Sequence, residues 1–261
     1  MTSGLVDTHC HLYMEPLGRD PFAARDRAAA RGVADIVVPA YDLASWELMA
    51  AYEAEPRLHT AYGLHPWLAH EPLPGGSLDG FIAILAARLD ATAAVAIGEI
   101  GLDTRIETSG VSEQMPLLEA QLQLAVARDL PVILHCRGAF EELLAAVANQ
   151  GGRLRGVVHA FSRGPDLGQR FIAAGLHVAF GGAITRPTAK RPRKGALRLP
   201  LERILLETDA PSIGLDGVAA CDTEPAHVAD VARALARLRG LSPADVARAT
   251  TANAQTLFGW T

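Results

Sequence analysis

Short apolar runs alternate along the chain with longer segments in which apolar residues recur at helical spacing. The runs are rich in Val, Ile and Leu, residues that favour strands. Strands that alternate with helices are typical of right-handed βαβ units and of a parallel sheet. We therefore predict eight strands, at residues 5–10, 35–39, 58–63, 94–98, 132–135, 156–159, 177–181 and 204–208.

The segments between these runs predict helices. They lie at residues 21–31, 43–53, 80–89, 115–128, 140–150 and 165–174. The connection between the last two predicted strands is the least helical one. Beyond the last strand, Thr223-Glu224-Pro225 opens a predicted helix that runs to about residue 238. Ser242-Pro243-Ala244-Asp245 has a capping serine, a proline at the first position and an acid in the first turn, which is a helix start. A last short helix is predicted at residues 253–258.

Eight strand–helix units in 261 residues fit a (β/α)8 TIM barrel. We predict one barrel domain that spans residues 1–261, and a doubly wound open sheet is the structural alternative. The Pro- and Gly-rich residues 71–76 are predicted to form a loop inside this domain.

Composition supports a large core, since 49% of the residues are hydrophobic. The net charge of −5 gives no global attraction to nucleic acid or to an anionic membrane, so any polyanion binding must be local. Three cysteines without framework spacing favour a reducing compartment. No signal peptide is evident, and no apolar run reaches the roughly 20 residues that cross a bilayer. We expect a soluble cytoplasmic protein with no membrane association and no obligate protein partner.

Polar residues that bind metals fall at the carboxyl ends of the predicted strands. These ends converge on one mouth in a barrel, which is where barrel active sites lie. Two histidines in Val6-Asp7-Thr8-His9-Cys10-His11 share one face of a pleated strand. The six candidates are His9, His11, Glu99, His135, His159 and Asp209. A lone histidine or carboxylate at a strand end is usually a satisfied polar residue, but six at one mouth predict a site for two divalent ions. Such mixed ligands accept Zn, Mn, Co or Mg.

Two cysteines sit beside these candidates. Cys10 and Cys136 each neighbour a histidine within a strand, so their side chains should point to the opposite face. We predict that both are small buried apolar residues rather than metal thiolates.

The order and spacing of these motifs resemble the TatD family of metal-dependent deoxyribonucleases, within the amidohydrolase superfamily. The resemblance rests on Asp7-Thr8-His9-Cys10-His11, Gly63-Leu64-His65-Pro66-Trp67, Gly98-Glu99-Ile100-Gly101-Leu102-Asp103, Glu207-Thr208-Asp209-Ala210-Pro211 and residues 253–258. It implies a barrel of the metallo-dependent hydrolase type and an enzyme that acts on ester bonds. It also implies one ion held by His9, His11, Glu99 and Asp209, and a second held by Glu99, His135 and His159. Several residues outside the ligands depart from the family pattern, for example Thr104-Arg105 after the aspartate, and these departures leave the substrate open.

Lysine content separates branches of the superfamily. Many relatives bridge their ions with a carbamylated lysine at the end of the fourth strand. The lysines here, Lys190 and Lys194, both lie in the predicted loop after strand seven. Glu99 is therefore predicted to bridge the ions, which favours the TatD-like branch.

The resulting hypothesis is a phosphodiester hydrolase that acts on DNA, from an end. The two ions would lower the pKa of a bridging water, and Asp209 would orient this nucleophile and handle its proton. His65 and Arg137 are candidates for holding substrate phosphates. A loop-packing role for His65 and a structural salt bridge for Arg137 are the alternatives.

A cationic run between the last two strands offers a local site for a nucleic-acid backbone. It spans residues 186–198 and contains Arg186, Lys190, Arg191, Arg193, Lys194 and Arg198. A solvated loop is the alternative interpretation of this run. Two other functions stay open: hydrolysis of an amide or ester in a small metabolite, and a metal-binding scaffold without catalysis. The complete set of six ligand candidates argues against the scaffold, and fold alone does not choose between substrates.

Overall fold

The computed structural model describes residues 4–260. Eight parallel strands follow one another around the sheet in chain order, each paired with the next. Their bounds are β1 Leu5–Asp7, β2 Val33–Pro39, β3 Leu58–Tyr62, β4 Ala96–Asp103, β5 Val132–Arg137, β6 Gly156–Val158, β7 Leu176–Phe180 and β8 Ile204–Leu206. Hydrogen bonds just beyond β1 and β8 join the last strand to the first, from Thr8 N to Leu206 O at 3.0 Å and from Asp209 N to His9 O at 2.8 Å. The barrel is thus nearly closed, which confirms the predicted fold and excludes the doubly wound sheet.

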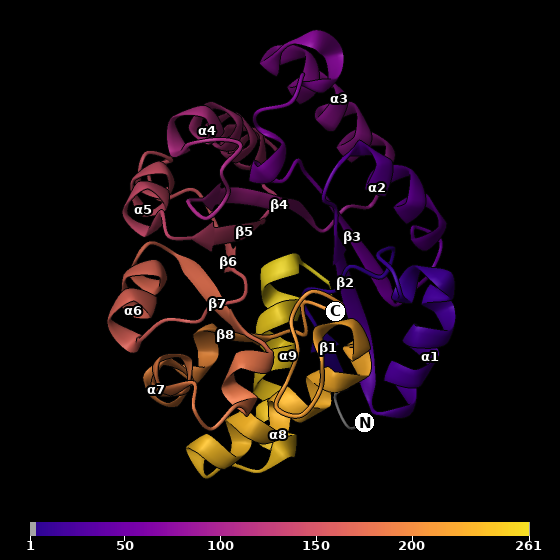
Figure 1. The fold of residues 1–261 in the computed structure, drawn as a ribbon, viewed down its shortest axis with the longest axis vertical. Helices are drawn as coiled ribbons and strands as arrows, with labels where there is room; N and C mark the ends of the chain where they lie inside the picture. The colour runs from indigo at the N-terminus through magenta and orange to yellow at the C-terminus, as the bar shows by residue number, and fades with distance from the viewer. Residues whose placement is uncertain (1–3, 261) are drawn as a thin grey trace.

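Helices surround the strands, as Figure 1 shows. Their bounds are α1 Pro21–Ala30, α2 Leu43–Met49, α3 Leu78–Ala91, α4 Val111–Arg128, α5 Phe140–Ala148, α6 Pro165–Ala173, α7 Lys190–Arg198, α8 Val228–Arg239 and α9 Pro243–Phe258. Within residues 4–260, none of these helices combines the length and the apolar character that crossing a membrane requires.

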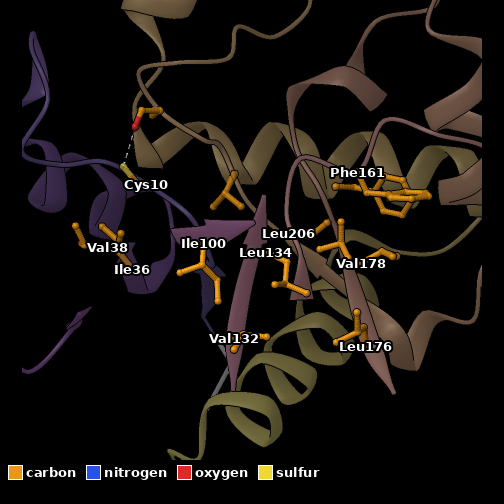
Figure 2. Close-up of a cluster of buried hydrophobic side chains, with 14 of the residues drawn as sticks. Cys10, Ile36, Val38, Ile100, Val132, Leu134, Phe161, Leu176, Val178 and Leu206 are labelled. Atoms are coloured by element: carbon orange, nitrogen blue, oxygen red, sulfur yellow. Dashed lines mark hydrogen bonds between the residues drawn. The ribbon is translucent and has the colours of Figure 1, made fainter. Parts of the chain in front are cut away.

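The strands bury both faces, which explains why they read as continuous apolar runs. One cluster fills the space between strands and helices and includes Ile36, Ile100 and Leu134, which are labelled in Figure 2. A second cluster lines the barrel interior. It combines alternate strand residues with the end of α9, namely Val6, Val37, Ala61, Ala96, Ile133, Val157, Ala179, Leu205, Ala254, Leu257 and Phe258. We call this second cluster the barrel floor.

Several strand bounds differ from the predicted ones by a few residues, and the differences at β1 and β4 move the candidate ligands relative to the strands. β1 ends at Asp7, because the side chain of Asp7 takes over hydrogen bonds from the backbone N–H groups of His9 and Thr208. The two histidines therefore follow the strand instead of sharing its pleat. β4 continues to Asp103, so Glu99 lies within the strand and not after it. Pairing of Ile100 with Leu134 in β5 sustains this extension.

The connection between β7 and β8 also differs from the prediction. Residues 190–198 of the cationic run form helix α7 and not a loop. Proline is tolerated in the first turn of a helix, where Pro192 stands, and buried Gly195 and Ala196 let α7 pack against its neighbours α6 and α8. Lys190 and Lys194 consequently project from a helix.

Residues 243–258 form one helix, α9, where the sequence predicted a helix start at Ser242 and a separate short helix at residues 253–258. α9 begins after Ser242, whose side chain accepts a hydrogen bond from Asp245 N, so the predicted start is confirmed. It continues unbroken through the residues predicted to begin a separate helix. Asn253 Nδ2 donates to Leu201 O and Ile204 O, which ties α9 to the start of β8.

The barrel floor predicts a specific stability contrast. Leu257 in the floor is 3% exposed, whereas Leu48 in α2 is 57% exposed. Leu257→Ala should lower the free energy of unfolding by about 2–5 kcal/mol, because it leaves a cavity in a packed interior. Leu48→Ala should change it by less than about 0.5 kcal/mol. Urea denaturation of both variants measures the contrast, and equal losses would contradict the assignment of α9 as the floor.

Candidate metal centre

Four of the predicted ligands meet after β1, within β4 and after β8. His9 Nε2 lies 3.1 Å from His11 Nε2 and 3.3 Å from Glu99 Oε2. Asp209 Oδ1 lies 3.7 Å from His9 Nε2 and 3.5 Å from His11 Nε2. All four side chains are buried. We call these four donors cluster A.

The remaining ligands surround the other oxygen of Glu99. Glu99 Oε1 lies 3.0 Å from His135 Nδ1 and 2.7 Å from His159 Nε2. These two ring nitrogens are 3.3 Å apart. His65 Nε2 is 3.4 Å from the same oxygen. We call Glu99, His135 and His159 cluster B, and Glu99 belongs to both clusters through different oxygens.

The donor spacing fits divalent ions. Ligands about 2.1 Å from a tetrahedral ion lie about 3.4 Å from one another. The measured gaps in cluster A run from 3.1 to 3.7 Å, and those in cluster B from 2.7 to 3.3 Å. Imidazole nitrogens and carboxylate oxygens are also the donors that Zn and Mn accept. The residues present therefore suit metal ions in both chemistry and scale.

The pKa values of several residues in the two clusters are strongly shifted. Burial alone would raise the pKa of Glu99, but His159, His65 and His9 hold it well below its usual range. Burial would lower the pKa of His159, yet the adjacent Glu99 carboxylate raises it far above its ordinary value. His135 behaves similarly, because hydrogen bonds to Asp103 and Glu99 outweigh its burial and raise its pKa. Metal ions would replace these protons.

A carboxylate that the sequence analysis did not single out orients His135. Asp103, at the end of β4, accepts hydrogen bonds through Oδ2 from His135 Nε2 at 2.9 Å and from Trp67 Nε1 at 2.8 Å. Gln114 in α4 holds the backbone of Asp103 on both sides, accepting from its N–H and donating to its C=O. With Nε2 protonated, Nδ1 of His135 faces cluster B as a free lone pair. The motif Gly101-Leu102-Asp103 could have drawn attention to Asp103, but its hydrogen-bond partner His135 is 32 residues away in the sequence.

Two other residues missed by the sequence analysis support cluster A. His11 Nδ1 donates to the Tyr13 hydroxyl at 2.9 Å, which in turn donates to Pro39 O at 3.0 Å. Asp7 accepts from both the backbone N–H and the hydroxyl of Thr208, at 2.9 and 2.6 Å. Asp7 thereby joins the segment that carries the histidines to the segment that carries Asp209.

The predicted substrate-binding residues lie at different depths. His65 is 4% exposed and touches cluster B, and burial lowers its pKa. Arg137 ends β5 and is exposed at the mouth. Their roles toward substrate stay predictions.

The two cysteines beside the ligand candidates lie outside the donor clusters. Cys10 is fully buried in the apolar core between strands and helices, as predicted, with its thiol directed at Ala210 O (Figure 2). Cys136 is half-buried against the same core, and burial raises its pKa to about 12.

Fold and site together define a (β/α)8 barrel with a candidate histidine–carboxylate metal centre at the carboxyl ends of its strands. A family model described as "TatD related DNase" matches residues 6–259. The chain belongs to the TatD family and is a metal-dependent hydrolase.

Individual relatives agree with this assignment. The chain is 37% identical to "Uncharacterized metal-dependent hydrolase YjjV" of Escherichia coli K12, over 99% of both chains. It is 30% identical to "Uncharacterized metal-dependent hydrolase YabD" of Bacillus subtilis, over 97% of this chain and 98% of that one. The crystal structure of the TatD homologue YjjV from E. coli superposes with a TM-score of 0.91 at 35% identity and covers 100% of both chains.

The raised pKa values predict that ion binding releases protons. In metal-free protein near pH 7, His159 carries a proton that a bound ion must displace, and hydrogen bonds to Asp103 and Glu99 shift the pKa of His135 in the same, upward direction. The apparent affinity should therefore rise with pH above neutrality, by about tenfold per pH unit for each proton displaced. Titration calorimetry at pH 7, in two buffers with different ionisation heats, should give different binding heats.

His59 provides the control for this titration. It pairs with Asp35 far from both clusters, so His59→Gln should release as many protons as the wild type. Identical heats in the two buffers for the wild type would contradict the protonation of His159 at neutral pH.

Proposed function

We propose that this chain is a phosphodiester hydrolase that uses two divalent ions and cuts DNA from an end, as a single catalytic domain of 261 residues. The observation that carries the proposal is the division of Glu99 between two donor clusters, with Oε2 in cluster A and Oε1 in cluster B. The family description as a DNase supports the substrate class. Zn, Mn and Mg are the candidate ions.

The ligand assignment follows the two clusters. His9, His11, Glu99 and Asp209 would hold one ion, and Glu99, His135 and His159 the other. Divalent ions in such positions lower the pKa of coordinated water and withdraw charge from a phosphoryl oxygen.

Asp209 and Glu99 are the proposed catalytic side chains. His11 and His9 hold the pKa of Asp209 below its usual range despite burial, so this carboxylate is ionised at neutral pH. Asp209 lies after β8 at the rim of cluster A, where it can orient a water and accept its proton. Glu99 keeps the two clusters at a fixed separation.

Arg137 and His65 are the proposed contacts to substrate phosphate. Arg137 stands exposed at the end of β5, and its guanidinium can make two parallel hydrogen bonds to a phosphate. His65 Nδ1 accepts from the Trp67 backbone N–H at 3.3 Å, so the donor that His65 would offer to a phosphate is Nε2–H, which lies beside cluster B at 3.4 Å from Glu99 Oε1.

Substitution of the proton acceptor tests the proposed reaction. Asp209→Asn removes the charge while keeping the shape, and should lower kcat on single-stranded DNA by about 10²–10⁴. Hydrolysis is followed on end-labelled single-stranded and duplex DNA, with a panel of amides and esters in parallel. DNA hydrolysis that persists in Asp209→Asn would contradict the proposed site. Hydrolysis of amides or esters but not DNA would replace the proposed substrate with a small metabolite.

Helix α7 is the proposed contact for the DNA backbone beyond the scissile phosphate. Its exposed cations Lys190, Arg191 and Lys194 lie in the first turns, which follow the carboxyl end of β7 and so lie nearest the mouth. Neutralising all three to Gln should weaken binding of single-stranded DNA. The slope of log K against log salt should flatten by about 0.7 for each lost phosphate contact.

A matched triple variant controls for net charge. Arg57, Arg153 and Arg237 are exposed, and the first two precede β3 and β6 at the opposite end of the barrel. Replacing these three with Gln should leave the salt slope unchanged. An unchanged slope in the α7 variant, measured by fluorescence anisotropy across a salt series, would reject the role of α7.

A further inference from the structure

A buried carboxylate lies beneath both donor clusters. Glu207 is 1% exposed, stands two residues before Asp209 and follows β8. Leu205, two residues earlier, points into the barrel floor, so Glu207 is directed into the barrel interior between the floor and the ligands. Gly181, which follows β7, lies beside this side chain: a Cβ there would be at contact distance, 3.4 Å, from Glu207 Cγ.

Glu207 uses one of its oxygens in a visible hydrogen bond. Oε1 accepts from Ala160 N, next to the ligand His159. Its other oxygen, Oε2, is fully buried and has no hydrogen-bond partner among residues 4–260. In the same region, the Nδ1 atoms of His9 and His159 are also buried without a partner. Buried polar atoms are costly when unpaired, so three of them in one place require an explanation.

The three residues lie close together. One carboxylate oxygen of Glu207 and one ring nitrogen of each histidine lie within 4.8 Å of one another. The two imidazole rings are stacked, with centroids 4.0 Å apart and planes 13° apart. Their Nε2 atoms both face Glu99, at 3.3 Å from His9 and 2.7 Å from His159. Nδ1 and Nε2 lie on opposite sides of an imidazole, so the Nδ1 atoms point away from Glu99.

We propose that Glu207 is a positioning residue for both ions, which accepts hydrogen bonds from Nδ1–H of His9 and of His159 through Oε2. A small rotation of the carboxylate, or one bridging water, closes a gap of this size. The hydrogen bonds hold each ring in the tautomer whose Nε2 lone pair faces its ion. This inference rests on the proposed two-ion centre.

The other two ligand histidines already have such acceptors. His135 donates to Asp103, and His11 donates to the Tyr13 hydroxyl. Asp103 serves only cluster B and Tyr13 serves only cluster A. Glu207 differs from both, because His9 belongs to cluster A and His159 to cluster B. One substitution there should therefore disturb both ions, whereas Asp103→Asn should disturb one.

Glu207→Gln is the informative variant. Its amide oxygen can keep the hydrogen bond from Ala160 N, which turns the NH2 group toward the two histidines. A donor then faces two donors, and the required tautomers lose their acceptor. We expect Glu207→Gln to weaken binding of both ions by about 10–100-fold, the usual effect of losing a partner behind a ligand histidine.

The experiment titrates metal-stripped protein with Co²⁺ in competition with a chromophoric chelator, and records the visible absorption of bound Co²⁺. Wild type should bind two ions. Glu207→Gln should weaken both and change the visible spectrum of both, and Asp103→Asn should weaken one. Glu53→Gln is the control, because Glu53 contacts Tyr62 and Arg88 far from the clusters, and it should match the wild type.

Each other outcome is decisive. If Glu207→Gln binds both ions within twofold of the wild type, the inference on Glu207 is wrong and the two-ion centre stands. If the wild type binds no Co²⁺, the proposed centre fails and the inference fails with it. Should Glu207→Gln not fold, ¹⁵N NMR of the Zn-loaded wild type decides: protonated Nδ1 on His9 and His159 supports the inference, and unprotonated Nδ1 overturns it.

Discussion

The candidate metal centre depends on the buried carboxylate of Glu99 and its contacts with the histidines. Its two oxygens face different histidine sets, and it is only 3% exposed. A carboxylate at this depth is stable only when charged or hydrogen-bonding partners surround it. Here the partners are imidazoles, which exchange protons for metal ions readily. The arrangement of imidazoles that offsets the cost of burying Glu99 is thus also suited to holding metal ions.

The barrel supplies rigidity in layers beneath this contact. The barrel floor, which includes the end of α9, fills the interior with packed apolar side chains and so fixes the positions of the strands. Above the floor, Asp7, Asp103 and Glu207 lie behind ligand-bearing segments and limit their freedom. The proposed ligands, held from behind by these residues, reach the mouth in a defined geometry, and the proposed substrate contacts, Arg137 and the cations of α7, are exposed.

Much of this could be predicted from sequence because it depends on local order. Alternation of strands and helices predicts the barrel, and ligand residues at strand ends predict a common mouth. Features that depend on distant partners could not be predicted. Trp67 reaches Asp103 across 36 residues, and Asn253 anchors α9 through backbone atoms before β8. The buried positions of helix α7 are a proline and two small residues in a cationic segment, so its packing against α6 and α8 reveals the helix more clearly than its sequence does. Glu207 could have been flagged, since it stands two residues from Asp209 and two residues after Leu205, which faces the barrel interior.

The most direct test of the central claim is anomalous X-ray diffraction from crystals of the Mn²⁺-loaded protein. Two peaks are expected, one on each side of Glu99 and each within about 2.5 Å of a different oxygen of its carboxylate. His9, His11 and Asp209 should complete the first ion, and His135 and His159 the second. A single peak, or peaks that do not contact Glu99, would contradict the two-ion account.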